Sequence, residues 1–275
     1  MEVEALEWER MVRTVRATRY VVPLREGGSL PAILEADDQG MYVVKFRGAG
    51  QGPLALIAEL VAGEIARALG LRVPEIVFAE VDPALGRNDP DYEIRQLLKA
   101  SAGRNLGLDY LPGSTTYDPA AKDEVGAEEA GLVVWLDAFV MNVDRTARNA
   151  NLLMWHRKLH LIDHGAALYP HHDWAGMVGK AEARFEAIQN HVLLSRVAGS
   201  EAGRIAEAGK VATARLGLGV FARIVAEVPE EWLDAIPAEG TAEEKRGVYL
   251  EFLTRRLEGA REFEKEARDA AERLI

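Results

Sequence analysis

The segment that most constrains this chain is 142–165, which reads NVDRTARNANLLMWHRKLHLIDHG. It places an aspartate, Asp144, and an asparagine five residues later, Asn149, in a polar stretch. Two short apolar runs within 152–162 are separated by a polar turn, which predicts a β-hairpin. The hairpin would return a second aspartate, Asp163, towards Asn149. A chain folded around this segment therefore brings two carboxylates and one amide into a single site.

These three side chains suit phosphoryl transfer, a reaction that depends on positioning and electrostatics more than on covalent steps. Asp144 could orient or accept the proton of an attacking hydroxyl, while Asp163 and Asn149 could supply oxygen ligands for Mg²⁺. The neighbouring Arg145 and Arg148 could steady phosphate charge or pair with structural carboxylates. The alternative is an Asp- and Asn-rich loop that caps a helix, with Asp163 in an ordinary turn. We favour phosphoryl transfer because the hairpin and IDHG follow D-x-x-x-x-N.

The N-terminal part of the chain predicts strands with tight turns and one buried helix. Short apolar, β-branched runs are separated by turn residues, which is the pattern of antiparallel strands. The helix at about 53–69 has a proline in its first turn, and Gly70 with Pro74 ends it. The predicted strands are 18–24, 30–36, 41–46, 73–81 and 92–98.

After about Ala100 the sequence predicts helices, apart from the hairpin just described. The predicted helices are 127–141, 181–198, 211–228 and 241–275. We therefore expect an α+β fold that forms one domain of two lobes. The small β-rich lobe, residues 1–100, would hold an antiparallel sheet and the first helix. The larger helical lobe, residues 101–275, would carry the polar loop and the hairpin.

Lys45 lies inside the apolar strand sequence YVVKFRG, where alternation places it on the opposite face from Val44. A lysine in such a strand needs a partner, and an ATP phosphate with a helix glutamate would supply two. The simpler alternative is an edge-strand lysine that reaches solvent. The helix offers Glu59 and Glu64 as the pairing carboxylate, and helical periodicity alone does not choose between them.

Two glycine-containing segments could approach a phosphate. Gly27, Gly28 and Ser29 lie between the first two predicted strands, where glycines would let backbone N–H groups come close to a phosphate. A plain hairpin turn explains the same residues equally well. The segment 48–52, GAGQG, follows the lysine strand, and we expect it to be a strand-to-helix connection.

The histidines after the hairpin form a weaker pattern. His164, His171 and His172 lie near Asp173, and such residue types can hold a metal ion. Their spacing matches no established zinc pattern, so we expect this segment to form a substrate-facing loop instead.

Composition excludes several classes of function. The 275 residues carry a net charge of −11, which argues against binding nucleic acid through its phosphates. The chain has no cysteine, so disulfides, a thiol nucleophile and thiolate metal sites are excluded. We see neither a secretion signal nor an apolar run of the roughly 18 residues that a membrane helix needs. We therefore expect a cytoplasmic protein without membrane insertion.

Four motifs together give the chain its resemblance to a known family. They are VVKF at Lys45, AELVAGEIARALGLRVP at 58–74, DRTARN at 144–149 and IDHG around Asp163. With these motifs the chain resembles the HipA-like kinases, which are also close in motif to phosphatidylinositol kinases. The resemblance extends from about residue 18 to at least 190. It implies a two-lobed protein-kinase-like fold that uses ATP and Mg²⁺.

The resemblance also implies roles for particular residues. In these families a glutamate opens the helix that ends in an ALG-x-x-VP-like stretch, which places the pairing role on Glu59. The strand predicted at 92–98 would be the hinge that meets adenine through Gln96 and Leu98. Thr146 stands where relatives usually have histidine, and His164 stands where protein kinases have phenylalanine. The phenylalanine-based activation switch is therefore not implied.

The phosphate acceptor would be a hydroxyl, with Ser or Thr of a protein as our first expectation and a lipid or small molecule as the alternative. A toxin role and a DNA-binding antitoxin partner are not implied, because the chain lacks room for the extra N-terminal subdomain of HipA toxins. The competing hypothesis is a pseudokinase that binds nucleotide without transferring phosphate. The presence of Lys45, Asp144, Asn149 and Asp163 together argues against it.

Overall fold

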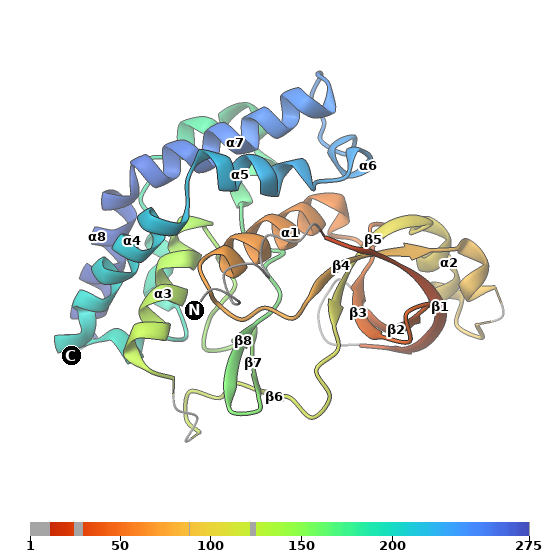
Figure 1. Cartoon of the computed structure of the whole chain (residues 1–275), viewed down its shortest axis with the longest axis horizontal. Coiled ribbons are helices and arrows are strands. Elements are labelled where there is room, and N and C mark those ends of the chain that lie inside the picture. Colours follow the sequence, from red (N-terminus) through yellow and green to blue (C-terminus); the bar gives the residue numbers. More distant parts are fainter. Residues whose placement is uncertain (1–11, 25–29, 88, 122–124, 275) are drawn as a thin grey trace.

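The computed structural model of the chain describes residues 12–24, 30–87, 89–121 and 125–274. A β-barrel with two helices is followed by a larger part that is helical apart from a small sheet (Figure 1). The strands are β1 (Thr14–Pro23), β2 (Ala32–Ala36), β3 (Met41–Lys45), β4 (Ile76–Val81), β5 (Gly103–Asp109), β6 (Thr115–Thr116), β7 (Leu152–Trp155) and β8 (Lys158–Leu161). The α-helices are α1 (Gly52–Ala68), α2 (Tyr92–Ala100), α3 (Ala127–Phe139), α4 (Gly203–Arg215), α5 (Leu218–Ala226), α6 (Glu230–Leu233), α7 (Ala242–Glu258) and α8 (Ala260–Glu272).

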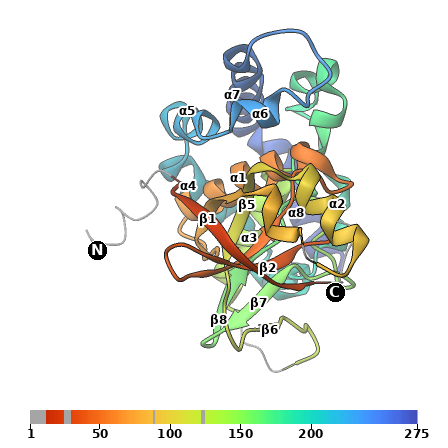
Figure 2. The ribbon, with the colours of Figure 1, turned by 90° about the vertical axis from the view of Figure 1, so that its right-hand side faces the viewer.

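The barrel has the strand order β1-β2-β3-β5-β4 and closes through a parallel contact between β1 and β4. The other strand pairs are antiparallel. Figure 2 looks onto this side of the molecule, with β1 and β2 towards the viewer. Apolar side chains such as Leu34, Val44 and Val77 fill a core cluster of the barrel. Because β5 belongs to the barrel, the β-rich part continues to Asp109.

Helix α1 lies between the barrel and the helical part of the molecule (Figure 1). Its residues from Leu56 to Ala66 are all buried, which explains why the helix is apolar around most of its circumference. Gly63 allows a close approach to β4, since a Cβ atom there would lie 2.6 Å from the Ile76 side chain. On the other side, α1 packs against α5 and α6. The helix that carries Glu59 is therefore held on both sides.

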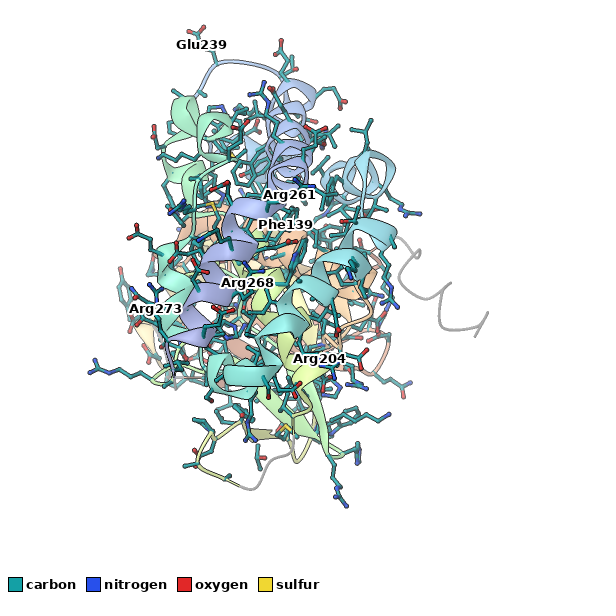
Figure 3. The ribbon with its side chains drawn as sticks, turned by 90° about the vertical axis from the view of Figure 1, so that its left-hand side faces the viewer. Phe139, Arg204, Glu239, Arg261, Arg268 and Arg273 are labelled. Atoms are coloured by element: carbon teal, nitrogen blue, oxygen red, sulfur yellow. The ribbon has the colours of Figure 1, made fainter. Side chains whose placement is uncertain are left out.

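The core of the helical part forms around α3, which packs against α4 and α8. Trp135 stacks on Phe139 with ring centroids 5.1 Å apart, and Phe263 of α8 meets Trp135 edge-on. Charged side chains such as Arg261 and Arg268 lie on the exposed side of α8 (Figure 3). None of the described helices combines the length and apolar character needed to cross a membrane.

The strand predicted at 92–98 is wrong, because these residues form helix α2. Asp91 caps the helix by accepting a hydrogen bond from the backbone N–H of Glu93 at 2.9 Å. Ile94, Leu97 and Leu98 follow a helical spacing and pack against the barrel core. The short apolar run fits a strand as well as a helix, and its tertiary position selected the helix.

The long helices expected near the C-terminus are shorter than predicted. Residues 181–198 contain short 3₁₀ turns in place of the predicted helix. The helix expected at 211–228 is two helices, α4 and α5, separated at Leu216 and Gly217, whose backbone is extended. The helix expected at 241–275 is divided at Gly259 into α7 and α8. Both breaks fall at or beside a glycine, where helix propensity is low.

Candidate active site

The predicted site residues Lys45, Glu59 and Asp163 lie in direct contact, although they come from three separate elements. Lys45 ends β3, Glu59 belongs to α1, and Asp163 follows β8. The Lys45 ammonium donates to Glu59 Oε2 at 2.5 Å and to Asp163 Oδ1 at 2.6 Å. Glu64, the other candidate, pairs instead with Arg67 at 2.7 Å. The lysine therefore joins the barrel, α1 and the hairpin at a single point.

The three side chains in this contact differ in solvent exposure. Glu59 is completely buried and Lys45 is 8% exposed, whereas the Asp163 side chain is 45% exposed. Burial alone would raise the pKa of Glu59, but the nearby Lys45 charge and the His164 hydrogen bond lower it below its ordinary value. Burial alone would lower the pKa of Lys45, but Glu59 and Asp163 raise it. The pair is thus ionised at neutral pH, with one accessible carboxylate beside it.

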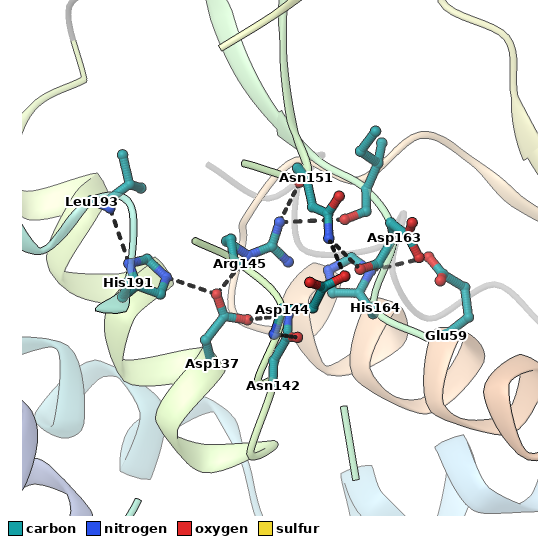
Figure 4. A network of polar contacts seen from close by, with 11 residues as sticks. Glu59, Asp137, Asn142, Asp144, Arg145, Asn151, Asp163, His164, His191 and Leu193 are labelled. Carbon is teal, nitrogen blue, oxygen red and sulfur yellow. Dashed lines mark hydrogen bonds and ion pairs between the residues drawn. The ribbon is translucent and has the colours of Figure 1, made fainter. Parts of the chain in front are cut away.

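His164 contacts the second oxygen of the buried Glu59 carboxylate. Its Nδ1 atom lies 3.2 Å from Glu59 Oε1, and the histidine side chain is completely buried (Figure 4). A phenylalanine at this position would leave that oxygen of Glu59 without this contact. The residue that departs from the protein-kinase pattern is therefore part of the site.

The polar loop brings Asp144 and Asn149 together. Asn149 Nδ2 donates to Asp144 Oδ2 at 2.8 Å, and Asn151 Nδ2 approaches the same oxygen at 3.5 Å. Asn151 also reaches the backbone carbonyl of Asp163 at 3.5 Å, so it joins the loop to the end of the hairpin (Figure 4). Sequence reasoning missed Asn151, because its role depends on a left-handed backbone (φ 49°) that places it between the two aspartates.

Three residues in the hairpin turn and just after the hairpin have a left-handed backbone. Strands β7 and β8 pair as predicted and are joined by His156 and Arg157, both with a left-handed backbone. Asp163 itself has φ 53°, a conformation that Asp adopts more readily than most residues. This turn directs its carboxylate to Lys45. Segment 48–52 is the connection between β3 and α1, as expected.

The site offers oxygen atoms of the kind that a magnesium ion prefers. Asn149 uses its Nδ2 group towards Asp144, which leaves its Oδ1 atom available, and the half-exposed Asp163 supplies a carboxylate. Mg²⁺ prefers such oxygen ligands and keeps several waters of its own. By contrast, the described residues contain no group of three or more His, Asp and Glu side chains placed to hold a metal. His171 contacts Tyr249 and Asp173 pairs with Lys180, so they form no zinc cluster.

The two arginines beside Asp144 have different surroundings. Arg145 is buried and pairs with Asp137 of α3 at 2.5 Å, so it holds a structural carboxylate. Arg148 is exposed. Asp137 and its second partner, His191, were missed by sequence reasoning, because they lie far apart in the chain and match no motif.

The residues predicted to bind the nucleotide also included a glycine turn and a hinge. Gly27, Gly28 and Ser29 fall outside the described residues. Gln96 and Leu98 lie on α2 and not on the strand that leads into the helical part, which is β5. Gln96 is exposed, and Leu98 is fully buried against Gly86. The hinge prediction for these two residues was based on the wrong secondary structure, and we withdraw it.

A β-barrel with a buried lysine–glutamate pair, followed by a helical part that carries the loop carboxylates, defines a protein-kinase-like fold. A family model described as HipA-like kinase matches residues 19–262, and the chain belongs to this family. The resemblance found in the four motifs is therefore confirmed.

One solved structure shows the same fold. A proinflammatory kinase of Helicobacter pylori, CtkA, is similar with a TM-score of 0.52 and 14% sequence identity, over 94% of this chain and 98% of that chain. The Golgi casein kinase is similar with a TM-score of 0.41 and 11% identity, over 93% of this chain and 75% of that chain. A search of curated proteins found no match.

Proposed function

We propose that this HipA-like kinase is an active ATP- and Mg²⁺-dependent phosphotransferase that transfers the γ-phosphate to a hydroxyl group. The observation that carries the proposal is the contact of Lys45 with both Glu59 and Asp163. In protein kinases a strand lysine paired with a helix glutamate, together with an aspartate that binds Mg²⁺, orients the ATP phosphates. The family supports the use of a nucleotide.

Each residue of the site has a role in this reaction. The Lys45 ammonium would bind ATP phosphate oxygens, with Glu59 fixing its position. Asp163 and Asn149 would hold Mg²⁺, which neutralises phosphate charge when it is bound. Asp144 would orient the acceptor hydroxyl and take its proton as the oxygen attacks the γ-phosphorus. The bond from the γ-phosphorus to the bridging oxygen breaks, and ADP leaves with that oxygen.

We propose Ser or Thr of a protein as the acceptor, and the cytoplasm as the compartment. Asp144 is only half-buried and Asn149 is exposed, so a residue on the surface of another protein could reach the base. The net charge of −11 would repel anionic membrane lipids, which disfavours a lipid acceptor. Incubating a cell lysate with the protein and a γ-thiophosphate analogue of ATP tests the acceptor directly. Label recovered only in lipid or small-molecule fractions would contradict a protein acceptor.

The transfer itself is tested by separating nucleotide binding from chemistry. We expect Mg²⁺ with ATP to raise the melting temperature of the protein, and removal of Mg²⁺ with EDTA to reverse most of the increase. Asp163→Ala should lose the Mg²⁺-dependent part. Asp144→Asn should keep the ATP-dependent shift but lose transfer, because it removes the proton acceptor without adding bulk. If γ-phosphate leaves ATP for no acceptor, including water, the chain is a pseudokinase.

A further inference from the structure

Arg145, which follows the proposed base directly in sequence, connects three separate parts of the site. It is 1% exposed. Its guanidinium donates to Asp137 Oδ2 at 2.5 Å, to the backbone carbonyl of Asn151, and to that of Ile162 at 3.3 Å (Figure 4). Asn151 lies just before β7, and Ile162 immediately precedes Asp163. One side chain therefore ties the end of α3, the start of the hairpin and its end to the loop that carries Asp144.

Asp137 holds this guanidinium in place. Its Oδ2 atom accepts hydrogen bonds from Arg145 and from His191 Nε2 at 2.8 Å, and its Oδ1 atom accepts from Asn142 Nδ2 at 3.0 Å. Burial alone would raise the pKa of Asp137, but the Arg145 charge and the His191 hydrogen bond lower it below its ordinary value. Asp137 is therefore ionised, and the cluster contains one buried cation and one buried anion.

His191 comes from a distant segment and is itself oriented by the backbone. The backbone N–H of Leu193 donates to His191 Nδ1 at 3.1 Å, so Nδ1 is the accepting nitrogen and Nε2 carries the proton that points to Asp137 (Figure 4). The same segment pairs with the loop, because Thr146 and His191 form an isolated β-bridge and Val192 donates to the Arg145 carbonyl at 3.1 Å. His191 thus contacts both the backbone of the loop and the carboxylate that holds Arg145.

We propose that Arg145, oriented by Asp137 and His191, is a positioning residue that sets the placement of Asp144 relative to Asp163. This inference rests on the proposed phosphotransfer, in which the base and the metal ligand act on the same phosphoryl group. A mutation far from the reacting atoms that misplaces a catalytic group by about 1 Å can reduce the rate by about 100-fold. The hydrogen bonds of the Arg145 side chain go to Asp137 and to two backbone carbonyls, so it would act through the loop.

The experiment compares variants that keep or remove each contact. Arg145→Lys keeps a cation for Asp137, but a single ammonium lacks the planar fork that also reaches the two carbonyls. His191→Phe removes the hydrogen bond to Asp137, whereas His191→Gln can keep both a donor and an acceptor. Arg256→Lys is the matched control. Arg256 is also buried and also binds carbonyls at the end of α3, but its other hydrogen bonds go to the carbonyls of Ala181 and Ala183 and not to the loop.

The first measurement is the conversion of ATP to ADP in the presence of Mg²⁺, with water as the acceptor. For Arg145→Lys and His191→Phe we expect kcat to fall about 10- to 100-fold while KM for ATP changes by less than about 3-fold. His191→Gln should recover most of the lost kcat. Arg256→Lys should keep wild-type kcat at a temperature where it is folded. Equal losses of kcat in Arg256→Lys and Arg145→Lys would overturn the proposal.

The second measurement does not depend on catalysis. Hydrogen exchange should become at least about tenfold faster at the amides of Ile162 and Val192 in His191→Phe, while amides of β3 and β5 keep their protection. Unchanged exchange at both amides would overturn the proposal even if kcat fell. If the wild-type protein transfers γ-phosphate to no acceptor, water and lysate proteins included, the proposed function fails, and the exchange result alone decides whether His191 and Arg145 position the loop.

Discussion

Replacing Lys45 with methionine should destabilise the protein by an amount that depends strongly on pH. Lys45 is 8% exposed and its partner Glu59 is completely buried, so the replacement leaves a buried carboxylate without its cation. Removing one partner of a buried ion pair typically costs about 3–5 kcal/mol. We expect a loss of about 3 kcal/mol near pH 8, towards the lower end, because His164 still contacts Glu59 at 3.2 Å.

The direction of the pH dependence follows from the pKa of Glu59. In the wild-type protein this pKa lies below the ordinary value of 4.5, so the stabilisation is complete above 4.5 and is constant between about pH 5 and 8. In Lys45→Met the effect of burial is no longer opposed by the Lys45 charge, and the pKa of Glu59 rises above 4.5. The folded variant then binds an extra proton as the pH falls, and its deficit shrinks by up to about 1.4 kcal/mol per pH unit.

The assay is urea denaturation of wild type and Lys45→Met at several pH values between about pH 5 and pH 8. Their difference in the free energy of unfolding should be largest at pH 8. The matched control is the double variant Lys45→Met/Glu59→Gln, which removes the carboxylate as well. It should regain stability at pH 8 and lose the pH dependence. A difference between wild type and Lys45→Met that does not vary with pH would refute the reasoning.

Two further predictions concern the scaffold of the site. His156→Asn/Arg157→Gly should stabilise the protein by about 1 kcal/mol without changing nucleotide binding, because both positions have a left-handed backbone that Asn-Gly adopts easily; a lower urea midpoint would contradict this. Trp232→Ala should cost about 3–5 kcal/mol, since this fully buried ring packs edge-on against Phe78 and donates to the Arg104 carbonyl at 3.0 Å. Trp232→Phe should lose much less, and equal losses in both variants would show that packing against the barrel is unimportant.

Local features of the sequence were sufficient for much of the site. The order of Asp144, Asn149 and Asp163 with a hairpin between them is a short-range property, because two apolar runs and a turn of two residues can pair in only a few ways. Alternation along β3 likewise indicated that Lys45 needed a partner. The layout of a β-rich part before a helical part followed from the period of the apolar residues.

The secondary structure predicted from the sequence was wrong where the apolar run was short. Residues 92–98 form a helix because Leu98 and its helical neighbours pack on the barrel, and a run of that length fits either period. The C-terminal helices were expected to be longer than they are, because periodicity continues across Gly259 although the backbone does not. In each case contacts with distant residues decided the outcome.

The sequence by itself determined which residue types the site contains, since motif spacing places a lysine, a helix glutamate, two aspartates and an asparagine in one family of folds. Helical periodicity did not choose which carboxylate meets Lys45; the family resemblance implied Glu59, and the tertiary structure gives the physical reason. Glu59 and Glu64 both lie on the buried side of α1, but the barrel and hairpin meet Glu59, while Arg67 takes Glu64. Only the tertiary structure could likewise bring His191 to Asp137, because partners so distant in the chain are chosen by packing and leave no local pattern.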